Sequence, residues 1–190
     1  GDFYWALEKK GWWYVAVADC TGHGVPGAFM MMLITALLNE ITGSEKLLTP
    51  AEILNEVRGK IIKELGQHGK AGETKDGMDV SFACLNLQTG ELHWAGANNP
   101  LYVIARVESR YVSGKQSEIA NEIASLPSVV RNDGHEIREI EPDYIPVGIH
   151  IGEPKPFTLQ TLKLKKGDII YMATDGYEDQ FGSNPSDGSK

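Results

Sequence analysis

The sequence has few cysteines and lacks a hydrophobic run long enough to cross a bilayer. Only Cys20 and Cys84 occur in 190 residues, so no disulfide framework is expected and a reducing cytoplasm is the predicted compartment. The longest uncharged apolar run, Ala28–Leu38, has about half the roughly 20 residues that a membrane span needs, which predicts a buried helix. No signal-peptide pattern opens the sequence, and no membrane contact is expected from this segment.

Basic residues are also scarce. The chain carries 18 Lys and Arg against 26 Asp and Glu, which gives a formal net charge of −8. Nucleic-acid binding is therefore not expected, because phosphate contacts require a face rich in Lys and Arg. Hydrophobic residues make up 42% of the chain and occur in periodic blocks, which excludes intrinsic disorder. The length predicts one domain.

Both ends of the sequence are abrupt. It begins at Gly1 within an aromatic, strand-like segment, without an initiator Met, and it ends in a stretch rich in Gly and Ser. These ends predict a domain core over residues 1–182 that is truncated on both sides, followed by a flexible tail at 183–190. The polar, mixed segment at 108–136 is expected to be a surface insertion.

Hydrophobic periodicity predicts strands and helices grouped in blocks. Apolar residues at Phe3–Leu7 and Trp12–Ala18 flank a short Gly-containing connection, which is typical of a β-hairpin. Two helices follow. One is expected from about Ala28 to Thr42, buried on most sides, and one from Thr49, which opens a capping box, to about Leu65. Further strands are expected at Val80–Leu87, Glu91–Ala97, Leu101–Val107, Ile137–Ile140, Phe157–Leu164 and Ile169–Ala173. Successive hairpins predict antiparallel sheets in a layered α+β fold.

A glycine-rich loop precedes the first helix. Gly22, Gly24 and Gly27 match G-x-G-x-x-G, the spacing of a dinucleotide-binding fingerprint. Two features disfavour that function. Pro26 removes a backbone N–H from a loop that should cradle a pyrophosphate, and the following strands form hairpins instead of a βαβ unit. Dinucleotide binding remains an alternative function on these three glycines alone.

Three aspartates lie at the ends of apolar strands. Asp2 opens the first strand, Asp19 closes the strand expected to pair with it, and Asp175 follows the last predicted strand. Carboxylates that converge from separate strands would supply the oxygen ligands that Mg²⁺ or Mn²⁺ prefers. Taken singly, each is equally well explained as a turn or cap residue, because Asp-Gly is a common turn.

Two further residues lie beside Asp19. His23, between two glycines, is either a general acid or metal ligand or a residue that caps the following helix, and both interpretations stay open. Cys20 lacks a Cys/His partner motif, and Asp19 would raise the pKa of its thiol. The backbone carbonyl of Cys20 is therefore the better candidate for a contribution to a site.

Three sequence blocks carry a resemblance to a known family. They are GDFYW at residues 1–5, VADCTGHGVPGA at 17–28 and ATDGYEDQ at 173–180. Together they resemble the signature blocks of the stage II sporulation protein E-type phosphatases, the bacterial branch of the metal-dependent, protein phosphatase 2C-like superfamily. Shorter similar blocks lie at 75–80, 95–101 and 146–148.

The resemblance implies a fold, a reaction and a set of site residues. The fold would be an α-β-β-α four-layer sandwich of two antiparallel sheets flanked by helices. The reaction would be hydrolysis of phosphoserine or phosphothreonine on a protein by a water that bridges two Mn²⁺ or Mg²⁺ ions. Asp19 matches the carboxylate that bridges both ions, and Cys20 matches the residue that donates its carbonyl. Asp2 and Asp175 match further ligands, and His23 lies near a histidine proposed as general acid in some members.

The resemblance also implies a role in bacterial signalling. The substrate would be a phosphorylated protein such as an anti-sigma factor antagonist, and the full protein would carry a sensory or membrane module and act as a homodimer. One departure is that the family's Asp-Asp pair before a final strand has no counterpart after Gln180, which leaves one metal site incomplete. A degenerate, non-catalytic domain that binds a phosphoprotein as a scaffold is the alternative from another functional class.

Overall fold

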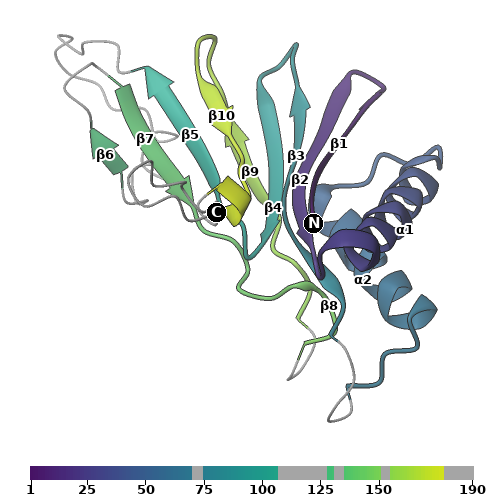
Figure 1. The fold of residues 1–190 in the computed structure, drawn as a ribbon. Helices are drawn as coiled ribbons and strands as arrows, with labels where there is room; N and C mark the ends of the chain where they lie inside the picture. Colours follow the sequence, from purple (N-terminus) through teal and green to yellow (C-terminus); the bar gives the residue numbers. More distant parts are fainter. Residues whose placement is uncertain (70–74, 107–127, 131–134, 151–154, 178–190) are drawn as a thin grey trace, which may run out of the picture.

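The structure, a computed structural model, describes residues 1–69, 75–106, 128–130, 135–150 and 155–177. Its strands form two antiparallel sheets, and two helices lie against one of them (Figure 1), so the predicted α+β class is confirmed. The predicted tail at 183–190 lies outside the described residues. So does most of the predicted insertion at 108–136, of which residues 128–130 and 135–136 belong to strands.

The first sheet has the strand order β1-β2-β3-β4-β9, with β8 paired to β3. Its strands are β1 (Asp2–Lys9), β2 (Trp12–Cys20), β3 (Gly77–Asn86), β4 (Glu91–Ala97), β8 (Val147–Gly148) and β9 (Gln160–Lys163). The predicted β1–β2 hairpin is confirmed, and its turn has positive φ at both Lys10 (51°) and Gly11 (80°). A two-residue turn with positive φ at both positions has a backbone twist that matches the right-handed twist of the paired strands. This turn sets the register in which Asp2 lies opposite Asp19.

The second sheet has the strand order β10-β5-β7-β6. Its strands are β5 (Leu101–Arg106), β6 (Ser128–Val130), β7 (His135–Ile140) and β10 (Ile169–Tyr171). A core between the sheets holds them face to face, and it is formed by Ala83, Leu92, Trp94, Leu101, Val103 and Ile140. The buried indole N–H of Trp94 donates a hydrogen bond of 2.9 Å to Ser81 Oγ, so its only polar group is paired.

Two helices, α1 (Gly24–Thr42) and α2 (Pro50–Glu64), cover the face of the first sheet that points away from the second sheet (Figure 1). The predicted capping box at the start of α2 is confirmed: Thr49 and Glu52 exchange side-chain-to-backbone hydrogen bonds. A second core lies between the helices and the sheet, where the rings of Trp5 and Phe82 meet edge to face at 6.0 Å. The fully buried residues of α2 in this core are Ile53, Leu54, Val57 and Ile61.

Helix α1 is less buried than the sequence predicted. Ile34 and Leu38 are buried, but Val25, Phe29 and Met32 are 69%, 66% and 63% exposed. The prediction of burial on most sides is therefore wrong, because a helix that is apolar all round gives no sequence signal for the stripe that faces the sheet. By length and apolar composition alone α1 could cross a membrane, a test that core helices of globular domains also meet.

The arrangement gives three layers in the described part of the chain: helices, first sheet, second sheet (Figure 1). The fourth, helical layer that the resemblance implies is not present among the described residues. Strands β2 and β3 are antiparallel neighbours, although two helices connect them. The alternative of a dinucleotide-binding domain is therefore wrong, since that fold requires parallel strands joined by a crossover helix.

The capping box gives a test of this fold. We expect Thr49→Ala to lower the free energy of unfolding by about 1 kcal/mol, because the Glu52 N–H loses its side-chain acceptor. Chemical denaturation followed by circular dichroism measures the loss. Thr49→Ser keeps the hydroxyl and should lose only a few tenths of that amount; equal losses in both variants would contradict the capping role.

Candidate metal centre

Asp2 and Asp19 lie directly opposite each other on β1 and β2. Side chains alternate between the two faces of a strand, and the neighbours of Asp19, Ala18 and Cys20, are buried in the core beneath the helices. Asp19 therefore points to the other face of the sheet, toward the second sheet. Its side chain is 37% exposed, so water and small ions can reach the carboxylate.

Asp175 reaches the same place from the second sheet. It begins η1 (Asp175–Tyr177), a short 3₁₀ helix a few residues after β10. One carboxylate oxygen from each of Asp2, Asp19 and Asp175 lies within 4.8 Å of the other two. The adjacent Gly176 permits this approach, because a Cβ at that position would collide with the Asp2 carboxylate. The three aspartates named from the sequence are thus brought together, and their role as metal ligands stays a prediction.

Backbone carbonyls add to this group of oxygens. The Gly1 nitrogen lies 2.6 Å from Asp19 Oδ1, 2.5 Å from the Cys20 carbonyl oxygen and 3.0 Å from the Gly22 carbonyl oxygen, so these three oxygens face one point. A carboxylate and carbonyls are also the ligands that hard divalent cations prefer, so these residues fit Mg²⁺ or Mn²⁺.

The loop between β2 and α1 owes its shape to glycine. Gly22 and Gly24 have φ of +94° and +61°, a region that favours glycine. A Cβ on Gly27 would come within 2.6 Å of the Gly22 carbonyl oxygen. The three glycines of G-x-G-x-x-G thus serve the tight turn that follows Asp19 and Cys20, and this need explains the motif without a dinucleotide.

His23 and the Cys20 thiol, the other two side chains considered from the sequence, have different environments. His23 is exposed at the N-cap position of α1, where its side chain makes no cap hydrogen bond, so the capping interpretation is not supported. The Cys20 side chain is buried in the core beneath the helices. Burial raises its pKa to about 11, and the nearby charges of Asp19 and Asp2 add to the shift. A thiol in this environment is a poor nucleophile at neutral pH.

Asp79 also lies at this place, although no motif in the sequence singled it out. It lies on β3 directly opposite Asp19, so Asp2, Asp19 and Asp79 form one row across three neighbouring strands. Its pKa is raised, chiefly by burial and also by the nearby charges of Asp19 and Asp175, while a hydrogen bond from Asn98 lowers it. The available signal was a charged residue inside an otherwise uncharged strand, Gly77–Asn86.

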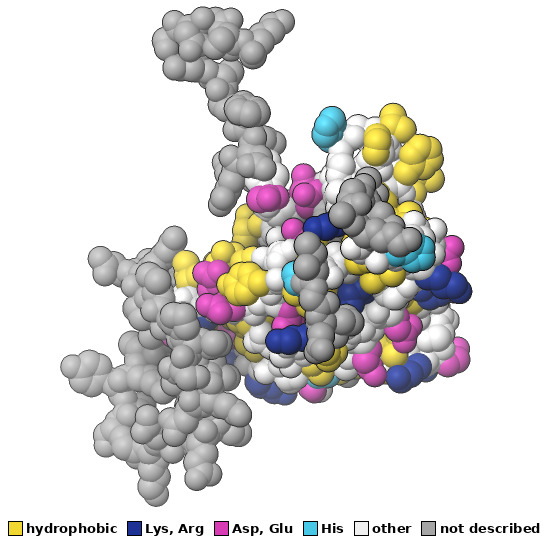
Figure 2. Space-filling model, turned by 90° about the horizontal axis from the view of Figure 1, so that it is seen from below, with side chains coloured by type: hydrophobic (Ala, Val, Ile, Leu, Met, Phe, Trp, Pro, Cys, Tyr) yellow, Lys and Arg dark blue, Asp and Glu magenta, His cyan; other side chains and the backbone are white. Residues whose placement is uncertain are grey.

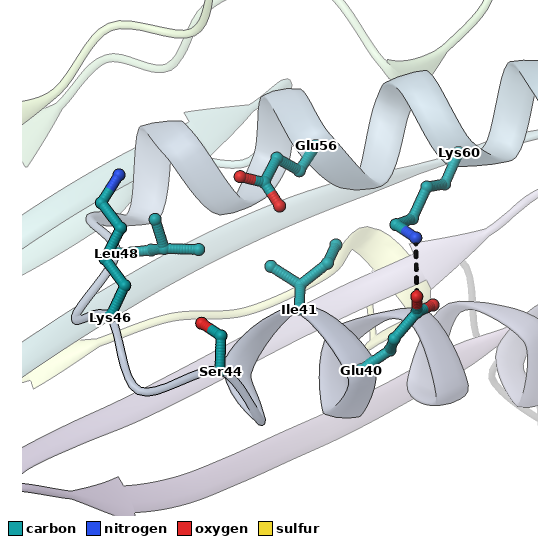
Figure 3. A pocket seen from close by; sticks show the side chains of 7 residues that line it. All are labelled: Glu40, Ile41, Ser44, Lys46, Leu48, Glu56 and Lys60. Carbon is teal, nitrogen blue, oxygen red and sulfur yellow. Dashed lines mark hydrogen bonds and ion pairs between the residues drawn. The ribbon is translucent and has the colours of Figure 1, made fainter.

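One pocket of about 390 Å³ lies elsewhere, between the end of α1 and α2 (Figure 3). The Lys60 ammonium and the Glu40 carboxylate form an ion pair of 2.8 Å at its edge. Since α1 is roughly 28 Å long at 1.5 Å per residue, this pocket is remote from Asp19, which precedes the other end of the helix. The pocket is lined by acidic, basic and apolar side chains, and these do not form a recognisable catalytic arrangement.

Acidic side chains form several small groups over the face seen in Figure 2, one of them beside a group of hydrophobic side chains. Among the described residues, Asp2, Asp19 and Asp175 are the group whose ligand atoms are close enough to hold one metal ion. Their mutual repulsion favours a cation between them. The fold is PP2C-like by its match to solved structures.

The chain belongs to the Stage II sporulation protein E (SpoIIE) family, whose model matches residues 9–120. Among solved structures it is similar to the SiaA-PP2C domain of Pseudomonas aeruginosa, with 24% identity and a TM-score of 0.68, covering 97% of this chain and 59% of that one. It is also similar to the RsbU and RsbW domains of Rv1364c from Mycobacterium tuberculosis, with 20% identity, a TM-score of 0.63, and 96% and 41% covered.

A third similar structure is RsbX in complex with magnesium, with 15% identity and a TM-score of 0.56, covering 92% of this chain and 66% of that one. At these identities the structures establish the fold alone. The chain spans about two fifths to two thirds of the length of these three structures. No curated protein sequence matches the chain.

The two buried thiols give a test of the site's chemistry. We expect Cys20 and Cys84 to react with a disulfide reagent at pH 8 far more slowly than free glutathione, because burial raises both thiol pKa values and so lowers the thiolate fraction. Both should react at once in guanidinium chloride. Stoichiometric labelling of Cys20 within seconds in native buffer would contradict the assignment of its side chain to the core.

Proposed function

We propose that this chain is a metal-dependent phosphoprotein phosphatase domain that hydrolyses phosphoserine or phosphothreonine. One observation carries the proposal: carboxylates from β1, β2 and η1 converge within 4.8 Å in a chain of the SpoIIE family. The proposed cofactors are two Mg²⁺ or Mn²⁺ ions, and the magnesium complex of RsbX supports the choice of ion. The proposed fold of the whole domain is the four-layer sandwich, with further helices outside the second sheet.

Each proposed site residue has a distinct role. Asp19, which lies opposite Asp2 and has its ligand atom within 4.8 Å of that of Asp175, would bind both ions, while Asp2 and Asp175 would each bind one of them. The Cys20 carbonyl would add a neutral oxygen ligand. When bound, the ions would lower the pKa of a shared water and offset charge on the phosphoryl group.

The start of α1 would help to place the phosphate. The helix begins directly after the metal-binding loop, its first turn has no acidic residue, and its first N–H groups lack a side-chain cap. Such an N-terminus favours an anion. His23, exposed at this point, would donate a proton to the departing serine or threonine oxygen.

The proposed setting is bacterial signalling in the cytoplasm. Structures with similar folds include the RsbU and RsbW domains of Rv1364c and a protein from the bacterial stressosome, which supports a phosphorylated regulator such as an anti-sigma factor antagonist as substrate. A homodimer and an attached sensory or membrane module belong to the same proposal.

Asp19→Asn tests this function. With Mn²⁺, the unaltered protein should release phosphate from a phosphoserine peptide, and the variant should lose at least about a hundredfold in rate, because one lost carboxylate weakens both ion sites. Isothermal titration calorimetry should show a parallel loss of Mn²⁺ binding. Glu64→Gln, an exposed charge removal on α2, is the matched control and should leave both measurements unchanged.

Two results would contradict the proposal. Asp19→Asn that keeps its activity, with circular dichroism showing a native fold, would remove Asp19 from the site. Mn²⁺ binding by the unaltered protein without any phosphate release would instead favour the non-catalytic phosphoprotein-binding alternative.

A further inference from the structure

We propose that Asp79, oriented by Asn98, is an outer carboxylate of the metal centre that accepts hydrogen bonds from ion-bound water and so raises the affinity for divalent cations. This inference rests on the proposed function. It concerns a positioning residue, because Asp79 would act on the ions through water and through the charge that it adds beside Asp19.

The row of three aspartates places Asp79 at the site. Asp19 and Asp79 are directly opposed on β2 and β3, as Asp2 and Asp19 are on β1 and β2. The residues on either side of Asp79, Met78 and Val80, are buried in the core beneath the helices. Asp79 therefore points to the same face of the sheet as Asp19, where directly opposite side chains have Cβ atoms about 4.5–5.5 Å apart.

The arrangement is costly without a cation. Like charges directly opposite each other destabilise a sheet. Within the described parts of the chain no Lys or Arg forms an ion pair with Asp79. A packing role alone would be served better by an apolar residue at this half-buried strand position. An acidic residue at this position is therefore better explained by its attraction to a cation bound beside Asp19.

Asn98 holds the Asp79 carboxylate in place without neutralising it. The Asn98 side-chain amide donates a hydrogen bond of 2.7 Å to Asp79 Oδ1. Asn98 itself has φ of 58°, a left-handed conformation that costs a non-glycine residue about 1 kcal/mol and that Asn tolerates better than most. Its backbone N–H donates to the Asp143 carbonyl at 2.9 Å, which fixes this conformation. A neutral donor thus orients the Asp79 carboxylate without placing a positive charge beside it.

The distances make Asp79 an outer residue. The ligand atoms of Asp2, Asp19 and Asp175 all lie within 4.8 Å of one another, and Asp79 does not belong to that group. Its Oδ1 is engaged by Asn98, which leaves Oδ2 as acceptor. A carboxylate just beyond the ligands, fixed by a second hydrogen bond, is the usual arrangement of groups that tune a metal site.

The test measures Mn²⁺ affinity and stoichiometry by isothermal titration calorimetry. Asp79→Asn keeps an oxygen acceptor for Asn98 but removes the charge, so we expect a loss of affinity of about 10- to 100-fold with unchanged stoichiometry. Asn98→Gly removes the donor and suits the positive φ, so it should fold normally and lose several-fold in affinity. Glu64→Gln again serves as the charge-matched control.

Each result decides the inference. Unchanged affinity in Asp79→Asn would overturn it while the proposed function stands, provided that the unaltered protein binds Mn²⁺ and releases phosphate. Loss of one bound ion would make Asp79 a direct ligand and overturn the outer assignment. A fall in metal-free thermal stability that accounts for the weaker binding would make the role structural. Failure of the unaltered protein to bind Mn²⁺ would overturn both proposals.

Discussion

Repulsion between carboxylates on neighbouring strands is the constraint that the rest of this structure has to offset. Asp2 and Asp19 oppose each other across β1 and β2, and Asp175 brings a third oxygen within 4.8 Å. At that separation two full charges repel by about 3 kcal/mol if the effective dielectric constant is near 20. Full burial of one large apolar side chain contributes roughly 1.5–3 kcal/mol, so a few residues of the two cores offset each repulsion. The scaffold can therefore hold the carboxylates together before a cation binds, and a bound cation adds to its stability.

Local backbone geometry brings carboxylates from the two sheets together at one site. The turn at Lys10 and Gly11 fixes which residues of β1 and β2 face each other. Gly176 lets the segment after β10 approach Asp2, which a side chain there would prevent. The packing of Trp94 and its neighbours between the sheets then brings these strand ends to the same place. Each of these features lies outside the carboxylates themselves, yet the distances among the carboxylates depend on all of them.

Much of this arrangement could be predicted from the sequence, because its signals are local. Alternating apolar residues and turn chemistry indicated the hairpins, and the Thr49 capping box indicated the start of α2. Position at strand ends and family resemblance singled out the three aspartates that the fold brings together. Asp79 was not singled out because a lone charge in the strand Gly77–Asn86 does not reveal its neighbours, and only the register across β2 and β3 places it opposite Asp19. The exposure of Phe29 was missed for a related reason: only tertiary packing decides which stripe of a uniformly apolar helix is covered.

The alternation of side chains also decides which chemistry the site can support. Along β2 the Cys20 thiol points into the core beneath the helices, while the adjacent Asp19 points to the opposite face. The same alternation buries Cys84 on β3. The face with the carboxylates thus receives only oxygen donors from these strands, namely the aspartate side chains and the Cys20 carbonyl. Soft ions such as Zn²⁺ favour thiolate and imidazole ligands, whereas Mg²⁺ and Mn²⁺ favour oxygen. The strand period that builds the core therefore also favours a hard cation over a soft one at this face of the sheet.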